Sequence, residues 1–490
     1  MTLLLLLLIP FLAGLACMAV PARIWWERLN LLAFAAVACL AARLGAQVAQ
    51  EGTATALDGF LRADALSAVV VGLTAFVALV CAIYAVGYFR WDLREGRISE
   101  KQLRRYYVLT PMFVCAMLLA PLADNLGVMW VAIESTTLAS VLLVTFYNQK
   151  TSFEAGWKYI IIGSVGISLA LFGTVITYSS AAIALPDDMH SGMNWSVLVG
   201  IAHKFNPTAM RLAFVLVLLG YGTKAGLAPM HTWKPDAYSE APVPAAALLG
   251  AGFINCAIYG IMRFDVLAEQ CLGHQFPSRL LVGFGVFSIL LAAPFVLVQR
   301  NFRRLLAYSS IDHAGIMVAA LGFGGKWGLL GAVLHMLFHA VTKPLMFFCA
   351  GNVQQEFGSP LFRKVHGVIH RLPWTGGLFL LATFAVTGTP PFSLFQSEFT
   401  ALSGALEAGS AWAAGLFVLG VVTIFIGFLL HMSKMNLGAA QENAPRAVEC
   451  PWKLSAMILV TIVVLMLGFW LPAPLYSLVQ NAATILGGPP

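Results

Sequence analysis

The chain has 490 residues, of which 60% are hydrophobic and only 10% are charged. A soluble globular chain carries about a quarter charged residues, so this composition excludes an ordinary soluble protein. Apolar runs of about 20 residues recur from one end to the other, and each can cross a hydrocarbon core of about 30 Å as a helix. The formal net charge of +7 is better explained by membrane topology than by nucleic-acid binding, so no nucleic-acid partner is expected.

The apolar runs predict about 14 membrane-spanning helices, because a backbone in lipid must satisfy its own hydrogen bonds. The first run, residues 3–20, lacks the basic leader and the cleavage signal of a signal peptide, so we interpret it as the first span. The tail after Pro472 is too short and too interrupted to predict another span. In chain order the expected spans are 3–20, 30–48, 64–88, 106–123, 125–147, 157–179, 208–229, 243–263, 279–299, 305–323, 328–351, 374–403, 410–432 and 454–473.

Basic residues gather in loops that follow odd-numbered spans, and loops after even-numbered spans carry far fewer. Since positively charged loops stay in the cytoplasm, odd-numbered spans are predicted to end there. Both termini would then lie on the outer side of a bacterial cytoplasmic (inner) membrane. The residues behind this prediction are Arg90, Arg94, Arg97, Lys101, Arg104, Arg105, Arg300, Arg303, Arg304, Arg363, Lys364, Arg371, Lys434, Arg446 and Lys453.

Two spans, one in each half of the chain, contain prolines that would break a helix, because proline removes a backbone hydrogen bond. The first break lies in residues 224–236 and the second in residues 387–398. A pair of interrupted spans predicts an internal repeat with an ion path at the breaks. His231 and Asp236 flank the first break and either belong to that path or cap its exposed backbone. The prolines are Pro229, Pro235, Pro390 and Pro391.

Two ionisable residues inside the predicted spans are candidates for proton exchange, since such groups are costly in a membrane. Glu134 lies near the middle of the fifth span, and Lys224 lies deep in the seventh, just before the first break. Desolvation pushes each group alone toward its neutral form, whereas pairing restores the charged forms. A pair that breaks and re-forms can therefore pass a proton. The alternative is a static salt bridge between two helices, which is costly in lipid.

The eleventh span carries His335, His339 and Lys343 at i, i+4 and i+8, which places all three on one helical stripe. Histidine exchanges protons near neutral pH, so we interpret the stripe as a proton path that faces the bundle interior. A zinc site and simple helix packing are the alternatives. No carboxylate or third ligand accompanies the two histidines in the sequence, so we expect no metal site.

Three further residues extend the predicted path. His313 lies in the tenth span beside Asp312 and is either a proton relay or a hydrogen-bonded core histidine. Glu398 follows the second break and is a candidate terminal proton site near one face. Lys158, at the start of the sixth span, either belongs to the path or extends its amine to the membrane interface.

These residues lie in stretches that resemble the antiporter-like subunits of respiratory complex I, and equally their relatives in membrane-bound hydrogenases and multisubunit sodium/proton antiporters. The likeness runs from about the fourth to the thirteenth span and is closest to the F component of hydrogenase-4. The stretches shared with the superfamily are Trp130–Glu134, Thr223–Lys224, Pro229–Ala237, Leu305–Ser310, His339–Lys343, Thr389–Phe392 and Ser397–Phe399. The closer match is carried by Asn125–Thr137, Glu154–Ile162 and Tyr238–Pro242.

The resemblance implies an all-α integral membrane fold of about 14 transmembrane helices, with two inverted five-helix repeats and two broken helices. It places the family's essential glutamate on Glu134, its broken-helix lysine on Lys224, its second-half relay on the His335–Lys343 stripe and its terminal acidic site on Glu398. The implied divisions are helices 1–3 in residues 1–105, a first repeat in 106–265, a second in 279–432, and a last helix and tail in 433–490.

Three positions depart from the family pattern. Asn255 occupies a place in the eighth span where complex I relatives often have a lysine, so the central relay would need water or His313 to bridge it. This asparagine also favours the hydrogenase-like branch. Lys234 replaces the leucine usual at the first break, and Tyr238 stands where a histidine is common.

The expected function is that of a proton-translocating membrane subunit of a membrane-bound hydrogenase or complex I-like redox pump. The eight cysteines are scattered singly, and the sequence has no Rossmann or Walker motif, so we expect no cofactor and no catalysis in this chain itself. Expected partners are other membrane subunits and a soluble redox arm with iron–sulfur and, in a hydrogenase, nickel–iron subunits. The alternatives are a gradient-driven sodium/proton antiporter subunit and a non-pumping anchor, which would be expected to lose costly charges.

Overall fold

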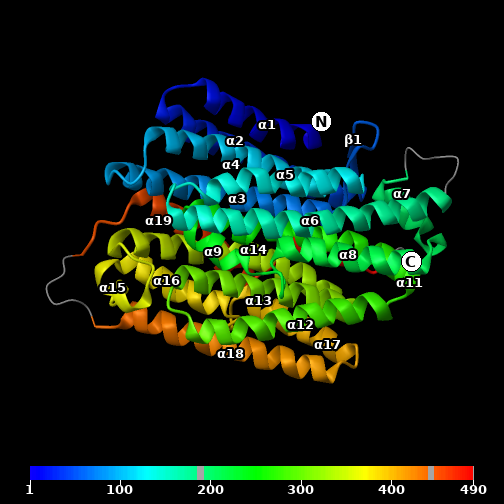
Figure 1. Cartoon of the computed structure of the whole chain (residues 1–490). Helices are drawn as coiled ribbons and strands as arrows, with labels where there is room; N and C mark the ends of the chain where they lie inside the picture. Colours follow the sequence, from blue (N-terminus) through cyan, green and yellow to red (C-terminus); the bar gives the residue numbers. More distant parts are fainter. Residues whose placement is uncertain (185–191, 440–445, 489–490) are drawn as a thin grey trace.

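The computed structural model describes residues 1–184, 192–439 and 446–488. Its helices lie side by side along one common direction and form a single bundle (Figure 1). Within the described residues, 13 helices are long and apolar enough to cross a membrane. A further span is divided between two short helices at the second break, so the expected all-α membrane fold with about 14 spans is confirmed.

The N-terminal helices cover one side of the bundle, and a short antiparallel hairpin joins the second helix to the third (Figure 1). The hairpin was not expected, because two strands of three residues leave no periodic pattern in the sequence. The elements of this part are α1 (Thr2–Ala19), α2 (Arg23–Glu51), β1 (Ala54–Ala56), β2 (Leu61–Ala63) and α3 (Ala65–Arg94).

The central part of the chain contains the first break. The structure extends the sixth span well beyond the predicted residues 157–179, because its polar first turns continue the helix past the apolar run. The elements are α4 (Glu100–Leu122), α5 (Leu126–Val144), α6 (Lys150–Ala184), α7 (Trp195–Ile201), η1 (Ala202–Lys204), α8 (Pro207–Ala225), α9 (Trp233–Glu240), α10 (Val243–Ala247), the π-helical turn η2 (Leu248–Phe253) and α11 (Ile254–Leu272).

The C-terminal part contains the second break. One helix, α14, continues without interruption past Pro344, as neighbouring protein allows in membrane helices. The elements are α12 (Gln275–Val298), α13 (Phe302–Phe323), α14 (Gly325–Phe357), η3 (Phe362–Lys364), α15 (Val368–Arg371), α16 (Pro373–Val386), α17 (Ser393–Glu407), α18 (Ala411–Leu437), α19 (Pro451–Phe469) and α20 (Ala473–Leu486).

Both predicted helix breaks are present. The first separates α8 from α9, and α8 ends on Gly226 in the left-handed conformation that glycine adopts readily at a helix C-terminus. The second separates α16 from α17 and contains Gly388 with φ +63°. The peptide bonds that precede Pro229 and Pro391 are cis. In each of the two predicted repeats the broken helix is the fourth of five, although the repeat itself stays a prediction.

Glycines bring two helix pairs into close contact, and the two pairs lie in different halves of the chain. A Cβ on Gly220 of α8 would lie 2.5 Å from the backbone nitrogen of Ala170 on α6. A Cβ on Gly285 of α12 would lie 2.5 Å from the backbone nitrogen of Ala319 on α13. Small residues allow membrane helices to approach closely where no water drives them together. These contacts fix the helix walls beside each break.

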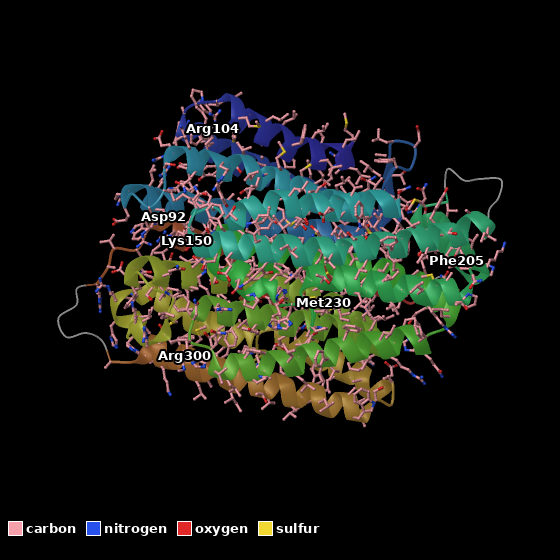
Figure 2. All side chains as sticks on the ribbon, viewed as in Figure 1. Asp92, Arg104, Lys150, Phe205, Met230 and Arg300 are labelled. Carbon is pink, nitrogen blue, oxygen red and sulfur yellow. The ribbon has the colours of Figure 1, made fainter. Side chains whose placement is uncertain are left out.

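Three basic residues that follow odd-numbered spans lie at one end of the bundle. Figure 2 shows Arg104, Lys150 and Arg300 at the end of the bundle on the left, whereas Phe205 lies at the opposite end. Met230, in the first break, lies about midway between the two ends in the same view. Both chain termini lie toward the end away from these basic residues (Figure 1).

A buried ion pair ties the start of α3 to α11. Arg263 Nη2 lies 2.7 Å from the carboxylate of Asp64, and both side chains are almost fully buried. Asp64 also caps α3, because it accepts a hydrogen bond from the backbone nitrogen of Ser67 at 3.0 Å. The guanidinium of Arg263 additionally stacks 4.1 Å from the ring centroid of Trp195. This residue therefore joins three segments of the bundle.

Replacement of Arg263 by Met should strongly destabilise the protein, because it leaves Asp64 buried without a cation. The expected cost is about 3–5 kcal/mol of unfolding free energy. Arg23→Met is the matched control, since Arg90 still pairs with the buried Glu27 at 2.5 Å when Arg23 is removed, so that carboxylate keeps a cation. Thermal unfolding in detergent measures both variants, and equal unfolding temperatures would contradict the assignment.

Candidate functional site

The structure places Glu134 of α5 in contact with Lys224 of α8, as predicted. Lys224 Nζ lies 3.1 Å from Glu134 Oε2. The same amine donates to the hydroxyl of Thr137, and that hydroxyl is 3.1 Å from Glu134 Oε2 and can donate to it. Lys224 is completely buried, whereas the Glu134 side chain is 25% exposed. The ammonium therefore has both an ionic and a neutral oxygen within reach, and its role in proton transfer stays a prediction.

The local helix geometry explains why Lys224 is tolerated at this depth. It lies in the last turn of α8, where the carbonyl end of a helix favours a cation. Gly163 on α6 leaves room for the amine, since a Cβ there would already lie 3.4 Å from Nζ. Tyr159 presents its ring 6.0 Å from Nζ. The break thus places the amine where the surrounding backbone and ring both stabilise positive charge.

A second group of ionisable residues forms where α13, α14 and α17 meet. His313 Nδ1 lies 3.0 Å from His335 Nε2, and His335 Nδ1 lies 3.0 Å from Ser397 Oγ. One nitrogen or oxygen atom each from His313, His335 and Glu398 lies within 4.8 Å of the others, and all three residues are buried. The expectation of no carboxylate or third ligand concerned His335 and His339. The structure instead groups His335 with His313 and Glu398, because helices distant in sequence supply these two residues, and the expectation of no metal site stays a prediction.

The predicted stripe of α14 faces the interior, since His335, His339 and Lys343 are all completely buried. Lys343 Nζ donates to Ser309 Oγ on α13 at 2.8 Å. The rings of His313 and His339 lie 4.9 Å apart. Neither ring nitrogen of His339 has a hydrogen-bond partner among the described residues. Buried groups of this kind are usually bonded to ordered water, so the chemistry of this region suits a hydrated proton path.

Glu398 owes its position to the glycine of the second break. Gly388 has φ +63°, and the Glu398 carboxyl lies so close to it that a Cβ there would overlap Oε2. A residue with a side chain would therefore be strained and would also displace the carboxyl. The break consequently brings an acidic group back against the interrupted backbone, beside the two histidines.

Lys158 and Asp236, two residues of the predicted set, pair with each other away from both groups. Lys158 is 45% exposed, and its Nζ lies 2.6 Å from Glu154 Oε1 and 3.0 Å from Asp236 Oδ2. Asp236 also pairs with Arg304 at 2.8 Å. Asp236 gives α9 no side-chain cap, so the capping alternative does not hold for it. The surface position of Lys158 agrees with the interfacial alternative. His231, at the first break, is buried and lies 6.4 Å from the Tyr308 ring.

Arg303 fixes the far end of the first broken helix. This buried arginine of α13 donates to the carbonyl of Tyr238 at 2.6 Å and also to the carbonyl of Ala241. Basic side chains commonly bond the free carbonyls at a helix C-terminus. The charge pattern predicts Arg303 only as a loop cation, because it does not show that the side chain turns inward.

Lys234 is a buried ionisable residue for which the sequence pattern predicts no role. It has no exposed surface, and its Nζ donates to the carbonyls of Ala225 and Ser310. The signal was present as a lysine between Trp233 and Pro235 inside a helix break. We had noted it only as a departure from the family pattern.

A bundle of about 14 spans with two interrupted helices and a buried series of acids, histidines and lysines defines an antiporter-like membrane subunit. The chain belongs to the family described as NADH:quinone oxidoreductase/Mrp antiporter, transmembrane region, which matches residues 123–427. The predicted resemblance is therefore confirmed, and the protein is a multi-pass membrane protein.

Curated relatives agree with this membership. The chain is 34% identical over 429 residues to the hydrogenase-4 component F homolog of Methylacidiphilum infernorum, covering 87% of this chain and 89% of that protein. It is 30% identical over 416 residues to NADH-quinone oxidoreductase subunit N of Desulforudis audaxviator, covering 83% and 80%.

Solved structures share the fold. A chain of the archaeal membrane-bound sulfane sulfur reductase superimposes with a TM-score of 0.86 at 22% identity, covering 99% of this chain and 97% of that one. A chain of the Mrp complex from Dietzia superimposes equally well, with a TM-score of 0.86 at 18% identity and coverage of 99% and 97%.

Replacement of Gly388 by Ala should force Glu398 away from its site and destabilise the second break. Overpacking of this kind costs about 1–3 kcal/mol of unfolding free energy, and the positive φ adds strain. Gly377→Ala on α16 is the control, because no other atom lies within 4 Å of a Cβ added there. Thermal unfolding of the two variants tests this, and a Gly388 variant as stable as the control would refute the packing argument.

Proposed function

We propose that the chain is a proton-translocating membrane subunit of a redox-driven complex, either a membrane-bound hydrogenase or a complex I-like pump. The observation that carries this proposal is the placement of ionisable residues at both helix breaks. The Glu134–Lys224 pair lies at the first break, and the His313–His335–Glu398 group lies at the second. Lys343 and His339 lie on the same interior helix as His335.

The Glu134–Lys224 pair can switch the protonation state of Lys224. The Lys224 ammonium is stabilised while the Glu134 carboxylate lies beside it and loses that stabilisation when the carboxylate moves away. Thr137 offers the amine a neutral oxygen, so the amine keeps a hydrogen bond when the ionic contact breaks. A conformational change that moves α5 relative to α8 would therefore make Lys224 gain or release a proton.

The His313–His335–Glu398 group supplies the continuation of the proton path. The hydrogen bond between His313 and His335 lets a proton pass from one ring to the next, and Ser397 holds the remaining nitrogen of His335. Glu398 accepts a proton at the break and gives it to water at one face. In this scheme the chain moves protons and performs no electron transfer of its own.

The exposed side of α5 supports partners within the membrane. The Glu134 side chain is 25% exposed at mid-span, between Val131 and Leu138, which are 51% and 67% exposed. A carboxylate that faced lipid at this depth would be costly. We infer that another membrane subunit covers this face. A redox arm would drive the change, since the relatives are named as a hydrogenase component and an NADH-quinone oxidoreductase subunit. We expect this arm to be soluble, with iron–sulfur and, in a hydrogenase, nickel–iron subunits.

The position of three basic residues supports an orientation of the bundle in the membrane. The basic residues Arg104, Lys150 and Arg300 mark the end that we assign to the cytoplasm (Figure 2). Both termini then lie on the outer side of a bacterial inner membrane, as the loop charges predict.

Glu134→Gln and Lys224→Ala should each abolish coupled proton translocation, because the Glu134–Lys224 pair cannot exchange charge in either variant. Assembly of the complex should be retained, because glutamine has nearly the size of glutamate, and because the Glu134 carboxylate left by Lys224→Ala is partly exposed and keeps the Thr137 hydroxyl as a partner. Proton uptake by membrane vesicles supplied with the electron donor of the complex measures translocation, and co-purified subunits measure assembly. Normal translocation in either variant would refute the switch.

The same vesicles separate the alternatives. Proton exchange driven by an imposed sodium gradient without any redox substrate would support a gradient-driven antiporter subunit instead. Retention of translocation in every site variant would support a non-pumping anchor.

We also propose that the His313–His335–Glu398 group shares a proton rather than a metal ion. The 3.0 Å separation of the two ring nitrogens is the length of an ordinary hydrogen bond, so a proton between them accounts for the geometry. Elemental analysis of the purified chain should then find zinc well below one atom per chain. Stoichiometric zinc that is lost in His313→Gln would contradict this.

A further inference from the structure

Lys234 lies outside the two groups that the proposed function uses. It is in the first turn of α9, completely buried, and its Nζ donates to the carbonyl of Ala225 at 2.6 Å and to that of Ser310 at 3.2 Å. Among the described residues, no carboxylate oxygen lies within 4.0 Å of it, in contrast to Lys224. An ammonium without a counter-ion is costly inside a membrane, so the fold alone gives little reason for a lysine here.

The two carbonyls that Lys234 contacts belong to different groups of the site. Ala225 directly follows Lys224 and is the last residue of α8. Ser310 directly follows Ser309, whose hydroxyl accepts the hydrogen bond from Lys343. Lys234 therefore lies between the lysine of the first break and the lysine of α14.

We propose that Lys234 is a proton-relay residue that connects the Lys224 side of the site with the Lys343 side, a role that rests on the proposed function. In the transfer, the Lys234 ammonium loses one proton through water to a neutral Lys343 amine. Lys234 is then neutral and Lys343 is an ammonium. A proton from Lys224 restores the charge of Lys234. Only N–H and O–H bonds form and break, and no electrons are exchanged.

The contacts of Lys234 suit both protonation states. An ammonium has three donor hydrogens and a neutral amine has two, so the two carbonyls can accept from the side chain in either state. Gain or loss of the proton therefore leaves neither carbonyl without a donor. A carboxylate partner would instead hold the charged state and oppose release. The absence of such a partner within the described residues is thus what a relay needs.

The backbone at the first break leaves a place for this side chain. A Cβ on Gly226 would lie 2.6 Å from Lys234 Cδ and 3.0 Å from its Nζ. Gly226 also has φ +76°, which disfavours other residues. The same glycine that ends α8 therefore makes room for the lysine of α9.

The competing explanation is a fixed charge. A permanently protonated Lys234 would stabilise the carbonyl end of α8 and would have no part in transport. Arginine distinguishes the two, because a guanidinium keeps the positive charge and the hydrogen-bond donors but does not release its proton.

The test uses the whole complex, purified through a tag on this chain and reconstituted in liposomes. A potassium gradient with valinomycin imposes a potential, and a pH-sensitive dye inside the liposomes reports proton flux. Lys234→Arg and Lys234→Met should each reduce the flux by about tenfold or more, the scale on which a positioned proton-transfer group acts. Lys453→Met is the matched control, because Lys453 is a buried lysine whose amine donates to Gln355 at 2.9 Å. Its flux should equal that of the unchanged complex.

The outcomes separate this inference from the proposed function. Flux at the unchanged level in Lys234→Arg or in Lys234→Met, with Glu134→Gln inactive, would overturn the relay and leave the proposed function standing. Normal flux in Glu134→Gln as well would overturn both. Assembly, read from the co-purified subunits, is expected in Lys234→Arg. Loss of assembly in both Lys234 variants, with Lys453→Met intact, would assign Lys234 a structural role and overturn the relay.

Discussion

The cost of charge in a lipid-shielded interior is the constraint on which this structure depends. Arg263, a charge that holds the fold together, is paired with Asp64. Charges at the helix breaks are paired less completely, because Lys234 and Lys343 have only neutral oxygens as hydrogen-bond partners among the described residues. A fully paired charge is fixed, whereas a charge held by neutral dipoles can leave. Pairing alone does not separate the two kinds of residue, since Lys224 has a carboxylate partner and the structural cation Arg303 has only neutral oxygens.

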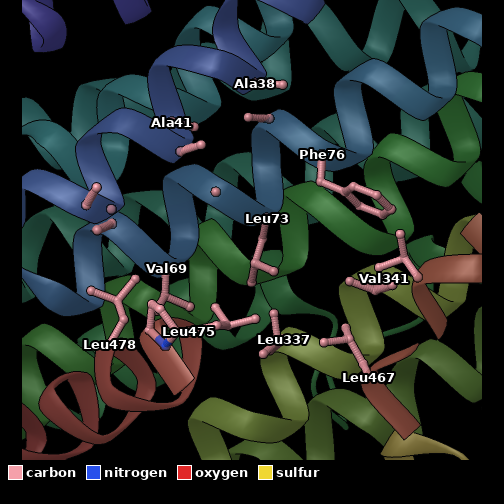
Figure 3. A pocket seen from close by; sticks show the side chains of 18 of the residues that line it. Ala38, Ala41, Val69, Leu73, Phe76, Leu337, Val341, Leu467, Leu475 and Leu478 are labelled. Atoms are coloured by element: carbon pink, nitrogen blue, oxygen red, sulfur yellow. The ribbon is translucent and has the colours of Figure 1, made fainter. Parts of the chain in front are cut away.

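The same constraint applies to the polar backbone at the helix breaks. Interrupted backbone in a membrane is tolerated only where protein or water surrounds it. Residues 226–228 of the first break are buried, whereas Pro229 of that break and Pro390 and Pro391 of the second are exposed in the single chain. Glycine contacts hold α6 against α8 and α12 against α13, so the walls beside the breaks are closely packed. One outward pocket is different in kind. It lies between α2, α3, α14, α19 and α20, is lined by apolar side chains such as Leu73 and Phe76, and contains none of the site residues (Figure 3).

Much of this arrangement could be predicted from the sequence because its causes are local. Prolines mark both breaks, and a repeat of four residues places His335, His339 and Lys343 on one face. The contact between Glu134 and Lys224 could be inferred because two isolated charges in neighbouring spans have few other partners. The convergence of Glu398 with His313 could not, since it depends on how α13 and α17 are placed along their axes against α14.

Two other residues show the same limit. Charge patterns count Lys234 and Arg303 but do not say whether a side chain turns inward at a helix end. The direction of Arg303 is decided by the free carbonyls of α9, and that of Lys234 by the space over Gly226. Both causes are contacts between different helices, which a sequence pattern does not show. The short hairpin and the polar first turns of α6 escaped prediction for a simpler reason, because neither leaves an apolar period in the sequence.

The contact of Arg303 with the end of α9 has a mechanical consequence. Arg303 lies in the first turn of α13, and the same helix carries Ser309, Asp312 and His313 further along. A displacement of α9 must either break the hydrogen bonds to a buried guanidinium or carry the start of α13 with it. Loss of these hydrogen bonds would leave a buried cation without partners, so movement of α13 together with α9 costs less free energy. A shift at the first break is then transmitted along α13 to the residues near the second break.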